Sequence, residues 1–205
     1  MKIFKQICLL IGLLLAIAVL SGCLEMTSEV RLNSDGSGIF QISSIISSDL
    51  SEMIAMDDSI NGSFIVLSEN ELRDLDASME GVQLIDYYLK EDRGVAVFSA
   101  TLSFESRADL EQVLEEAGMR LLPDTNDKQM SIEILSDESL DIELDDMTMD
   151  MADSIRYQFI FHAPGKIIEV SPDSIMVESR KVYFEIPLLD AIQNKEAVRM
   201  SVQWQ

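Results

Sequence analysis

Short stretches of alternating apolar and polar residues dominate the chain and predict β-strands with one buried face. The clearest covers 95–104, where the even-numbered positions from Ala96 to Phe104 are all apolar. By the same pattern, further strands are predicted at 24–32, 39–46, 82–90, 129–135, 155–162, 166–170, 175–177, 182–186 and 197–204.

Turn sequences predict how several of these strands are joined. The run Asn33 to Gly38 contains Asp35-Gly36, which suits a tight hairpin between the first two strands. Glu91 to Gly94 joins the strands at 82–90 and 95–104, and Ser179-Arg180 joins the last hairpin. Pro164-Gly165 ends the strand that begins at Ile155.

Two helices are marked by their caps. Ser106 is followed three residues later by Asp109, and Gly118 ends the apolar stripe that begins at Leu110. A second helix is predicted to open at Ser68 and to end at Gly81, with Glu71 completing a capping box: 68–81. A shorter helix at 49–58 and a helical turn at 188–193 complete the pattern.

These elements predict an α+β fold: an antiparallel sheet built from hairpins, with two or three amphipathic helices packed on it. The span 23–205 is long enough for one domain with its own core. The sequence contains no fixed-period repeat.

The N-terminus has the pattern of an export signal. Lys2 and Lys5 precede an uncharged apolar run of 14 residues, 7–20, which is short of the roughly 20 residues that a spanning helix needs. The run ends in Leu20-Ser21-Gly22-Cys23, which closely resembles the lipobox of prokaryotic lipoproteins. That resemblance implies removal of residues 1–22 by cleavage between Gly22 and Cys23, and a lipid on Cys23. The alternative is an uncleaved anchor followed by a chance cysteine.

A lipid on Cys23 would place the domain at the outer face of a cell membrane. One acyl chain anchors a protein only marginally, whereas the two or three chains on a lipoprotein cysteine, such as palmitate, attach it durably. Cys8 would leave with the signal, so the mature chain would keep no thiol for a disulfide, a zinc site or a nucleophile.

The mature chain would keep 13 basic and 37 acidic residues, a formal charge of −24. Such a charge repels a phosphate backbone, so we expect no nucleic-acid partner. It also opposes flat binding to an anionic lipid surface, so we expect the body of the domain to stand off the membrane on its tether. The charge is typical of a solvated acidic surface, and a basic partner or a store of cations is the alternative.

Candidate chemistry is sparse. The segment 137–153 carries eight acids, but a calcium loop starting at Asp141 would have Asp146 where glycine is needed and Ala152 where glutamate is needed. His162, the single histidine, ends a strand, and no Gly-x-Ser-x-Gly motif accompanies it. We therefore expect no catalytic residue, no metal and no cofactor.

Three methionines alternate within the acidic segment: Met147, Met149 and Met151. Alternation places them on one side of an extended strand, where they would pack in the core or at an edge. An adaptable apolar binding surface is the alternative.

The C-terminal run YQFIFHAPGKIIEVSPDSIMVESRKVYFEIPLLDAI, 157–192, resembles the LppM-like domain of bacterial lipoproteins. The start of the mature chain is similar too, with a cysteine, a strand, Asn-Ser-Asp-Gly-Ser-Gly and a second strand. The resemblance implies a single LppM-like domain over 23–205 and supplies no catalytic residues. Members often carry a C-terminal membrane helix, which this sequence lacks, so the lipid would be the anchor.

The leading hypothesis is a non-enzymatic envelope lipoprotein that binds an apolar ligand or a protein partner. A hydrolase that uses carboxylates or a bound cation is the second hypothesis, and it requires acids that converge in a cleft. A passive structural or assembly subunit is the third.

Overall fold

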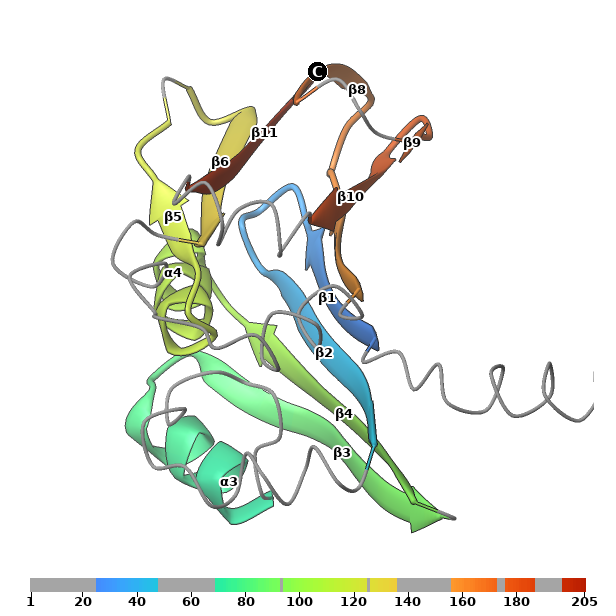
Figure 1. Cartoon of the computed structure of the whole chain (residues 1–205). Coiled ribbons are helices and arrows are strands. Elements are labelled where there is room, and N and C mark those ends of the chain that lie inside the picture. Colours follow the sequence, from blue (N-terminus) through green and yellow to red (C-terminus); the bar gives the residue numbers. More distant parts are fainter. Residues whose placement is uncertain are drawn as a thin grey trace, which may run out of the picture.

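The structure is a computed structural model, and it describes residues 25–47, 69–92, 94–124, 126–135, 156–172, 176–186 and 197–205. These residues form two β-sheets and two α-helices, so the predicted α+β class is confirmed (Figure 1). The predicted lipobox, the predicted helix at 49–58, the acidic segment and the predicted turn at 188–193 lie outside the described residues.

The larger sheet has seven strands. Their spatial order is β3 (Val82–Asp92), β4 (Val95–Phe104), β2 (Gly38–Ser47), β1 (Glu25–Leu32), β7 (Arg156–His162), β10 (Lys181–Ile186) and β9 (Met176–Val177). The predicted hairpins β1–β2, β3–β4 and β9–β10 are all present and antiparallel.

The pairing of β1 with β7 is parallel, which makes the large sheet mixed rather than purely antiparallel as expected. Turn sequences determine the direction of strands that follow one another in the chain. They carry no information about β1 and β7, which meet only through the tertiary fold. A hydrogen bond between Ser28 and Tyr157, 3.0 Å long, links the two strands, and burial raises the pKa of Tyr157 to about 12.

The smaller sheet has four antiparallel strands, in the order β5 (Arg120–Leu122), β6 (Gln129–Leu135), β11 (Val198–Trp204) and β8 (Ile167–Ser171). The strand β5 was not predicted, because three residues are too few to show alternation. After Pro164-Gly165 the chain leaves the large sheet, and β8 pairs with β11. The one predicted sheet is therefore two.

Both described helices were predicted. In α4 (Arg107–Glu116), the Ser106 hydroxyl accepts a hydrogen bond from the backbone N–H of Asp109, as the cap requires. The other helix, α3 (Glu69–Ser78), lies beside β3. Neither of these two helices has the length and apolar character needed to cross a membrane.

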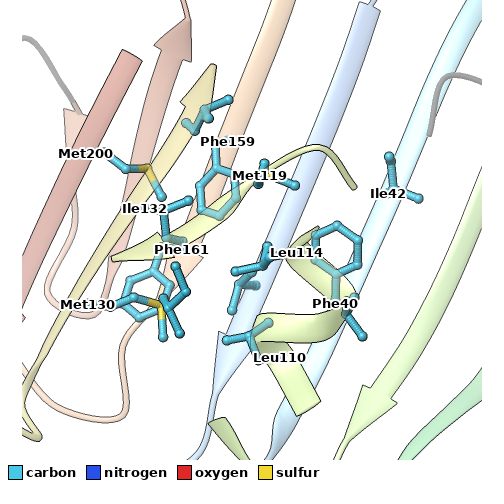
Figure 2. Close-up of a cluster of buried hydrophobic side chains, with 14 of the residues drawn as sticks. Phe40, Ile42, Leu110, Leu114, Met119, Met130, Ile132, Phe159, Phe161 and Met200 are labelled. Carbon is cyan, nitrogen blue, oxygen red and sulfur yellow. The ribbon is translucent and has the colours of Figure 1, made fainter. Parts of the chain in front are cut away.

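The core fills the space between the large sheet on one side and α4 with the smaller sheet on the other (Figure 2). Phe40, Phe159 and Phe161 project into it from the large sheet, and each is fully buried. Leu114 of α4 and Ile132 of β6 meet them from the opposite side. The described part of the sheet–helix interface is thus occupied by side chains.

Candidate functional site

A pocket of about 460 Å³ lies where turns from both sheets meet the first residue of α4. Its lining comes from the β1–β2 turn, the start of α4, the loop before β6, the β7–β8 turn and the end of β11. We call it the turn pocket, and it is lined by Leu32, Asn33, Ser34, Asp35, Gly36, Arg107, Asp127, Lys128, Pro164, Gly165, Trp204 and Gln205.

The β1–β2 turn forms one wall, and its own hydrogen bonds hold its shape. The Asn33 carbonyl accepts from the Gly36 N–H at 3.2 Å, and Gly36 has a φ of 88° that favours glycine. The Asp35 carboxylate accepts from the Ser37 hydroxyl at 2.6 Å and from the Ser37 N–H at 3.1 Å. These two bonds lower the pKa of Asp35, which therefore stays ionised.

The opposite wall depends on a close approach at Gly165. A Cβ atom there would lie 2.1 Å from the Gln205 carbonyl oxygen and 3.1 Å from Cδ1 of Trp204, so a side chain would push the β7–β8 turn off β11. Trp204 is buried and packs on Phe161 with ring centroids 5.8 Å apart. With Leu32 and Pro164, Trp204 gives the pocket an apolar part.

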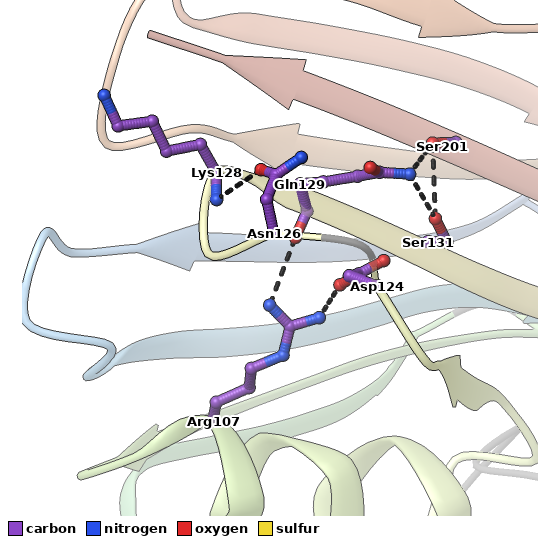
Figure 3. Close-up of polar contacts among 7 residues, drawn as sticks. All are labelled: Arg107, Asp124, Asn126, Lys128, Gln129, Ser131 and Ser201. Carbon is purple, nitrogen blue, oxygen red and sulfur yellow. Dashed lines mark hydrogen bonds and ion pairs between the residues drawn. The ribbon is translucent and has the colours of Figure 1, made fainter.

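Arg107 contributes a cation from the first turn of α4. Its guanidinium forms an ion pair with Asp124 and donates a hydrogen bond of 3.1 Å to the Gln129 carbonyl (Figure 3). The Asp124 side chain is only 4 % exposed, and within the described structure its carboxylate oxygens have no hydrogen-bond donor of good geometry. The charge of Arg107 is therefore what compensates this buried carboxylate. Burial lowers the pKa of Arg107, but a guanidinium stays charged at neutral pH.

Hydrogen bonds order the loop that carries Asp127 and Lys128. Asn126 accepts from the Lys128 N–H at 2.9 Å, and the Lys128 carbonyl accepts from the Trp204 N–H at 3.0 Å. Beyond it, the amide of Gln129 lies between the hydroxyls of Ser131 and Ser201, 3.3 Å from each (Figure 3). Asp127 and Lys128, which are exposed at the rim of the pocket, are therefore held by an ordered backbone.

His162 lies elsewhere, at the end of β7. Its Nε2 is 2.8 Å from Oε1 of Glu29 on β1, and the same oxygen is 2.6 Å from Nε of Arg31. Burial is the main cause that lowers the pKa of His162, against the opposing effect of Glu29. His162 of β7 therefore belongs to a polar group that it forms with Glu29 and Arg31 of the neighbouring strand β1.

The other sequence candidates are not brought together by the described residues. Gly22, Cys23, the acidic segment and its three methionines lie outside them. Over the ranges that are described, no group of three or more His, Cys, Asp or Glu residues is arranged to hold a metal ion. Sequence reasoning missed the ion pairs Arg107–Asp124 and Glu133–Arg199, because neither pair is adjacent in the chain.

Two features that carried the family resemblance do meet at the turn pocket. The Asn-Ser-Asp-Gly run and Pro164-Gly165 are far apart in sequence but line the same cavity. The glycines in both segments mark them as turns in the sequence. The sequence does not show that the two turns lie close together in the fold.

Comparison with known proteins gives a match in structure. No protein-family model matches the chain, and no curated protein matches it significantly. Among solved structures, the folded domain of the Mycobacterium tuberculosis protein LppM superposes with a TM-score of 0.53 at 13 % identity. The match covers 89 % of this chain and 90 % of that domain. The chain therefore has the fold of the LppM folded domain, and the resemblance predicted from its sequence is confirmed at the level of the fold.

Proposed function

We propose that the protein is a lipid-anchored, non-enzymatic envelope lipoprotein that binds a small amphipathic ligand in the turn pocket. The observation that supports this proposal most directly is the composition of the pocket. Its apolar lining comes from Trp204, Leu32 and Pro164, and its lining also includes the cations Arg107 and Lys128. Binding sites typically combine apolar walls with a few placed polar groups. In the described residues the space between the sheets and α4 is filled by buried side chains, so we place the ligand in the turn pocket.

The export signal supports the anchor. Cleavage before Cys23 would leave the lipid two residues ahead of β1. The turn pocket lies at the other end of β1, and eight strand residues span about 26 Å. The pocket would open well away from the lipid attachment, where a ligand from the aqueous phase reaches it.

The hydrolase alternative has one observation in its favour, since Asp35 and Asp127 line the same pocket. A carboxylate pair of that kind needs one member that holds a proton as the general acid. The hydrogen bonds from Ser37 lower the pKa of Asp35 and keep it ionised, so Asp35 cannot be that acid. The role would fall to Asp127, which is exposed to solvent rather than held in an apolar environment. We therefore place binding ahead of hydrolysis.

Trp204 makes the proposal measurable, because it is the only tryptophan in the sequence. The probe is 8-anilinonaphthalene-1-sulfonate, an amphipathic dye that accepts energy from tryptophan. We expect saturable loss of Trp204 emission on titration of the full chain. Lys128→Glu at the pocket rim should weaken this binding, and Lys90→Glu on β3 should not. Equal effects of both substitutions, or a signal that never saturates, would contradict the pocket as the site.

Native mass spectrometry of protein purified from its own membrane then identifies the natural ligand. A bound small molecule that is lost in Lys128→Glu and kept in Lys90→Glu supports the proposal. A preparation that carries none, and that hydrolyses a substrate in an Asp127-dependent way, would favour the enzyme.

A further inference from the structure

One end of the large sheet carries exposed apolar side chains from three strands. Ile45, Tyr88 and Val95 are 41 %, 47 % and 39 % exposed. The register pairs Ile45 with Val97, two positions from Val95 on the same face of β4. Tyr88 pairs with Ser99, the next residue of β4 on that face. We call Ile45, Tyr88, Val95 and Val97 the hairpin-tip face.

On β2 and β4 the opposite face is the buried one. Ala96 and Phe98 point into the core and are almost completely buried. The hairpin-tip face therefore lies on the outer side of the large sheet, at the end where β3 and β4 are joined (Figure 1). Single exposed apolar residues are common on protein surfaces, but a continuous strip of them across three strands is typical of an interaction site.

This end of the sheet is also where the lipid would be. Glu25, the first residue of β1, pairs with Ile45. Cys23 is two residues earlier, and two residues span at most about 7 Å. Two strand spacings, about 10 Å, separate Glu25 from Val97. A lipid on Cys23 thus confines the hairpin-tip face to the immediate neighbourhood of the bilayer surface.

We propose that the hairpin-tip face rests on the lipid surface and acts as a second membrane contact beside the acyl chains. This inference rests on the lipidation of Cys23 in the proposed function. Tyr88 suits the interface, since an aromatic ring with a polar tip favours the headgroup level. Lys90 lies on the same face, opposite Val97, where its ammonium reaches lipid phosphates.

Tethering explains why so small a surface is sufficient. Once the acyl chains hold Cys23, contact of the hairpin with lipid becomes an intramolecular event with a high effective concentration. A few partly exposed side chains can then orient the domain. A second copy of the chain or a soluble partner has no such advantage at this face.

The overall charge sets the depth of the contact. In the sequence, Lys90 and Arg93 offset Glu91 and Asp92, so the hairpin itself carries no net charge, but the −24 of the mature chain opposes close approach to an anionic surface. The contact is therefore shallow, and it is stronger on zwitterionic than on anionic lipid. The body of the domain stays off the membrane, as the overall charge requires.

The test uses the full chain, processed and lipidated, in phosphatidylcholine vesicles with brominated acyl chains. The mature chain has no free thiol once Cys8 is removed and Cys23 is lipidated, so Val95→Cys introduces a single labelling site for an environment-sensitive dye. The matched control is Val177→Cys, because Val177 is 48 % exposed on the opposite edge strand. Val177 is level with Val182, Phe161 and Val30, near the far end of β1.

We expect bromine quenching and a blue shift for the dye at position 95 and neither for the dye at 177. Vesicles of phosphatidylglycerol should reduce the quenching at 95. Equal quenching at the two positions, or a blue shift at 95 without quenching, would overturn the inference, the latter by showing a protein contact instead.

Mass spectrometry of the same sample separates the two proposals. If Cys23 carries no lipid and the protein leaves the vesicles, the anchoring in the proposed function has failed. If the lipid is present, the protein is retained and position 95 is unquenched, only the membrane contact has failed.

Discussion

Arg107 and Asp124 form an ion pair in which the Asp124 side chain is 4 % exposed and the Arg107 side chain 36 % exposed. Removing the cation would leave a buried negative charge without compensation, and loss of one partner of a buried pair costs about 3–5 kcal/mol. Because Arg107 reaches water at the turn pocket, we expect Arg107→Ala to lower the free energy of unfolding by about 2–3 kcal/mol. Urea denaturation followed through Trp204 fluorescence measures this.

The double variant Arg107→Ala/Asp124→Ala is the control. It removes the stranded charge, so it should be more stable than Arg107→Ala alone. If the two substitutions simply add, the pair is not coupled and this account of Arg107 is wrong.

Acidification should destabilise the protein through His162. Burial lowers the pKa of His162 from 6.5, with Lys181 and Arg31 acting in the same direction and Glu29 opposing. The folded state therefore prefers the neutral imidazole. The stability that this preference contributes is complete above pH 6.5 and is lost as the pH falls through the lowered pKa.

Comparison of variants tests the sign of this effect. His162→Gln cannot be protonated, so its free energy of unfolding should fall less than that of the parent protein between about pH 7 and about pH 5.5. Glu29→Gln removes the group that opposes the shift and should make the fall steeper. Urea denaturation at each pH gives the comparison, and an unchanged slope in His162→Gln would refute the assignment.

Two glycines at strand ends should respond very differently to alanine. A Cβ atom at Gly38 would lie 2.1 Å from the Arg31 carbonyl oxygen and 2.4 Å from Cζ of Phe104. We expect Gly38→Ala to cost about 3 kcal/mol, because backbone and a core ring must move. At Gly94 nothing lies within 4 Å, and only the positive φ of 82° opposes a side chain, so Gly94→Ala should cost about 1 kcal/mol. Thermal unfolding of both variants ranks them, and equal losses would contradict the packing described at Gly38.

The export signal expected at the N-terminus can be tested with a matched control. Cys23→Ala should abolish incorporation of a radiolabelled lipid precursor and leave the chain uncut, whereas Cys8→Ala should change neither. Cell fractionation and the mass of the mature chain provide the measurement. Normal processing of Cys23→Ala would exclude the lipobox.

The sequence predicted the parts of this fold that depend on neighbours in the chain. The capped helix at Ser106, the alternation along β4 and the Asp35-Gly36 hairpin are all local, and all three are confirmed. The parallel pairing of β1 with β7 and the transfer of β8 to a second sheet were not predicted, because both depend on contacts between distant segments.

In the candidate site, too, the local features were predictable from the sequence and the long-range contacts were not. The glycine turns at 33–38 and 164–165 are visible in the sequence, but their meeting around Trp204 depends on how the two sheets pack. The partnership of Arg107 with Asp124 was invisible for the same reason. Nothing in the spacing of a charged residue shows which distant charge it will meet.

The parallel pairing of β1 and β7 also bears on the order in which the chain is made and folded. Ser28 and Tyr157, which bond across it, are 129 positions apart, so β1 keeps one open edge until most of the chain has been produced. A chain exported from its N-terminus would carry this half-paired strand outside the membrane while β7 is still in transit. Such distant pairing slows folding and exposes strand edges to aggregation. The attachment predicted at Cys23 would hold this half-paired strand two residues from the membrane surface while its second edge is still open.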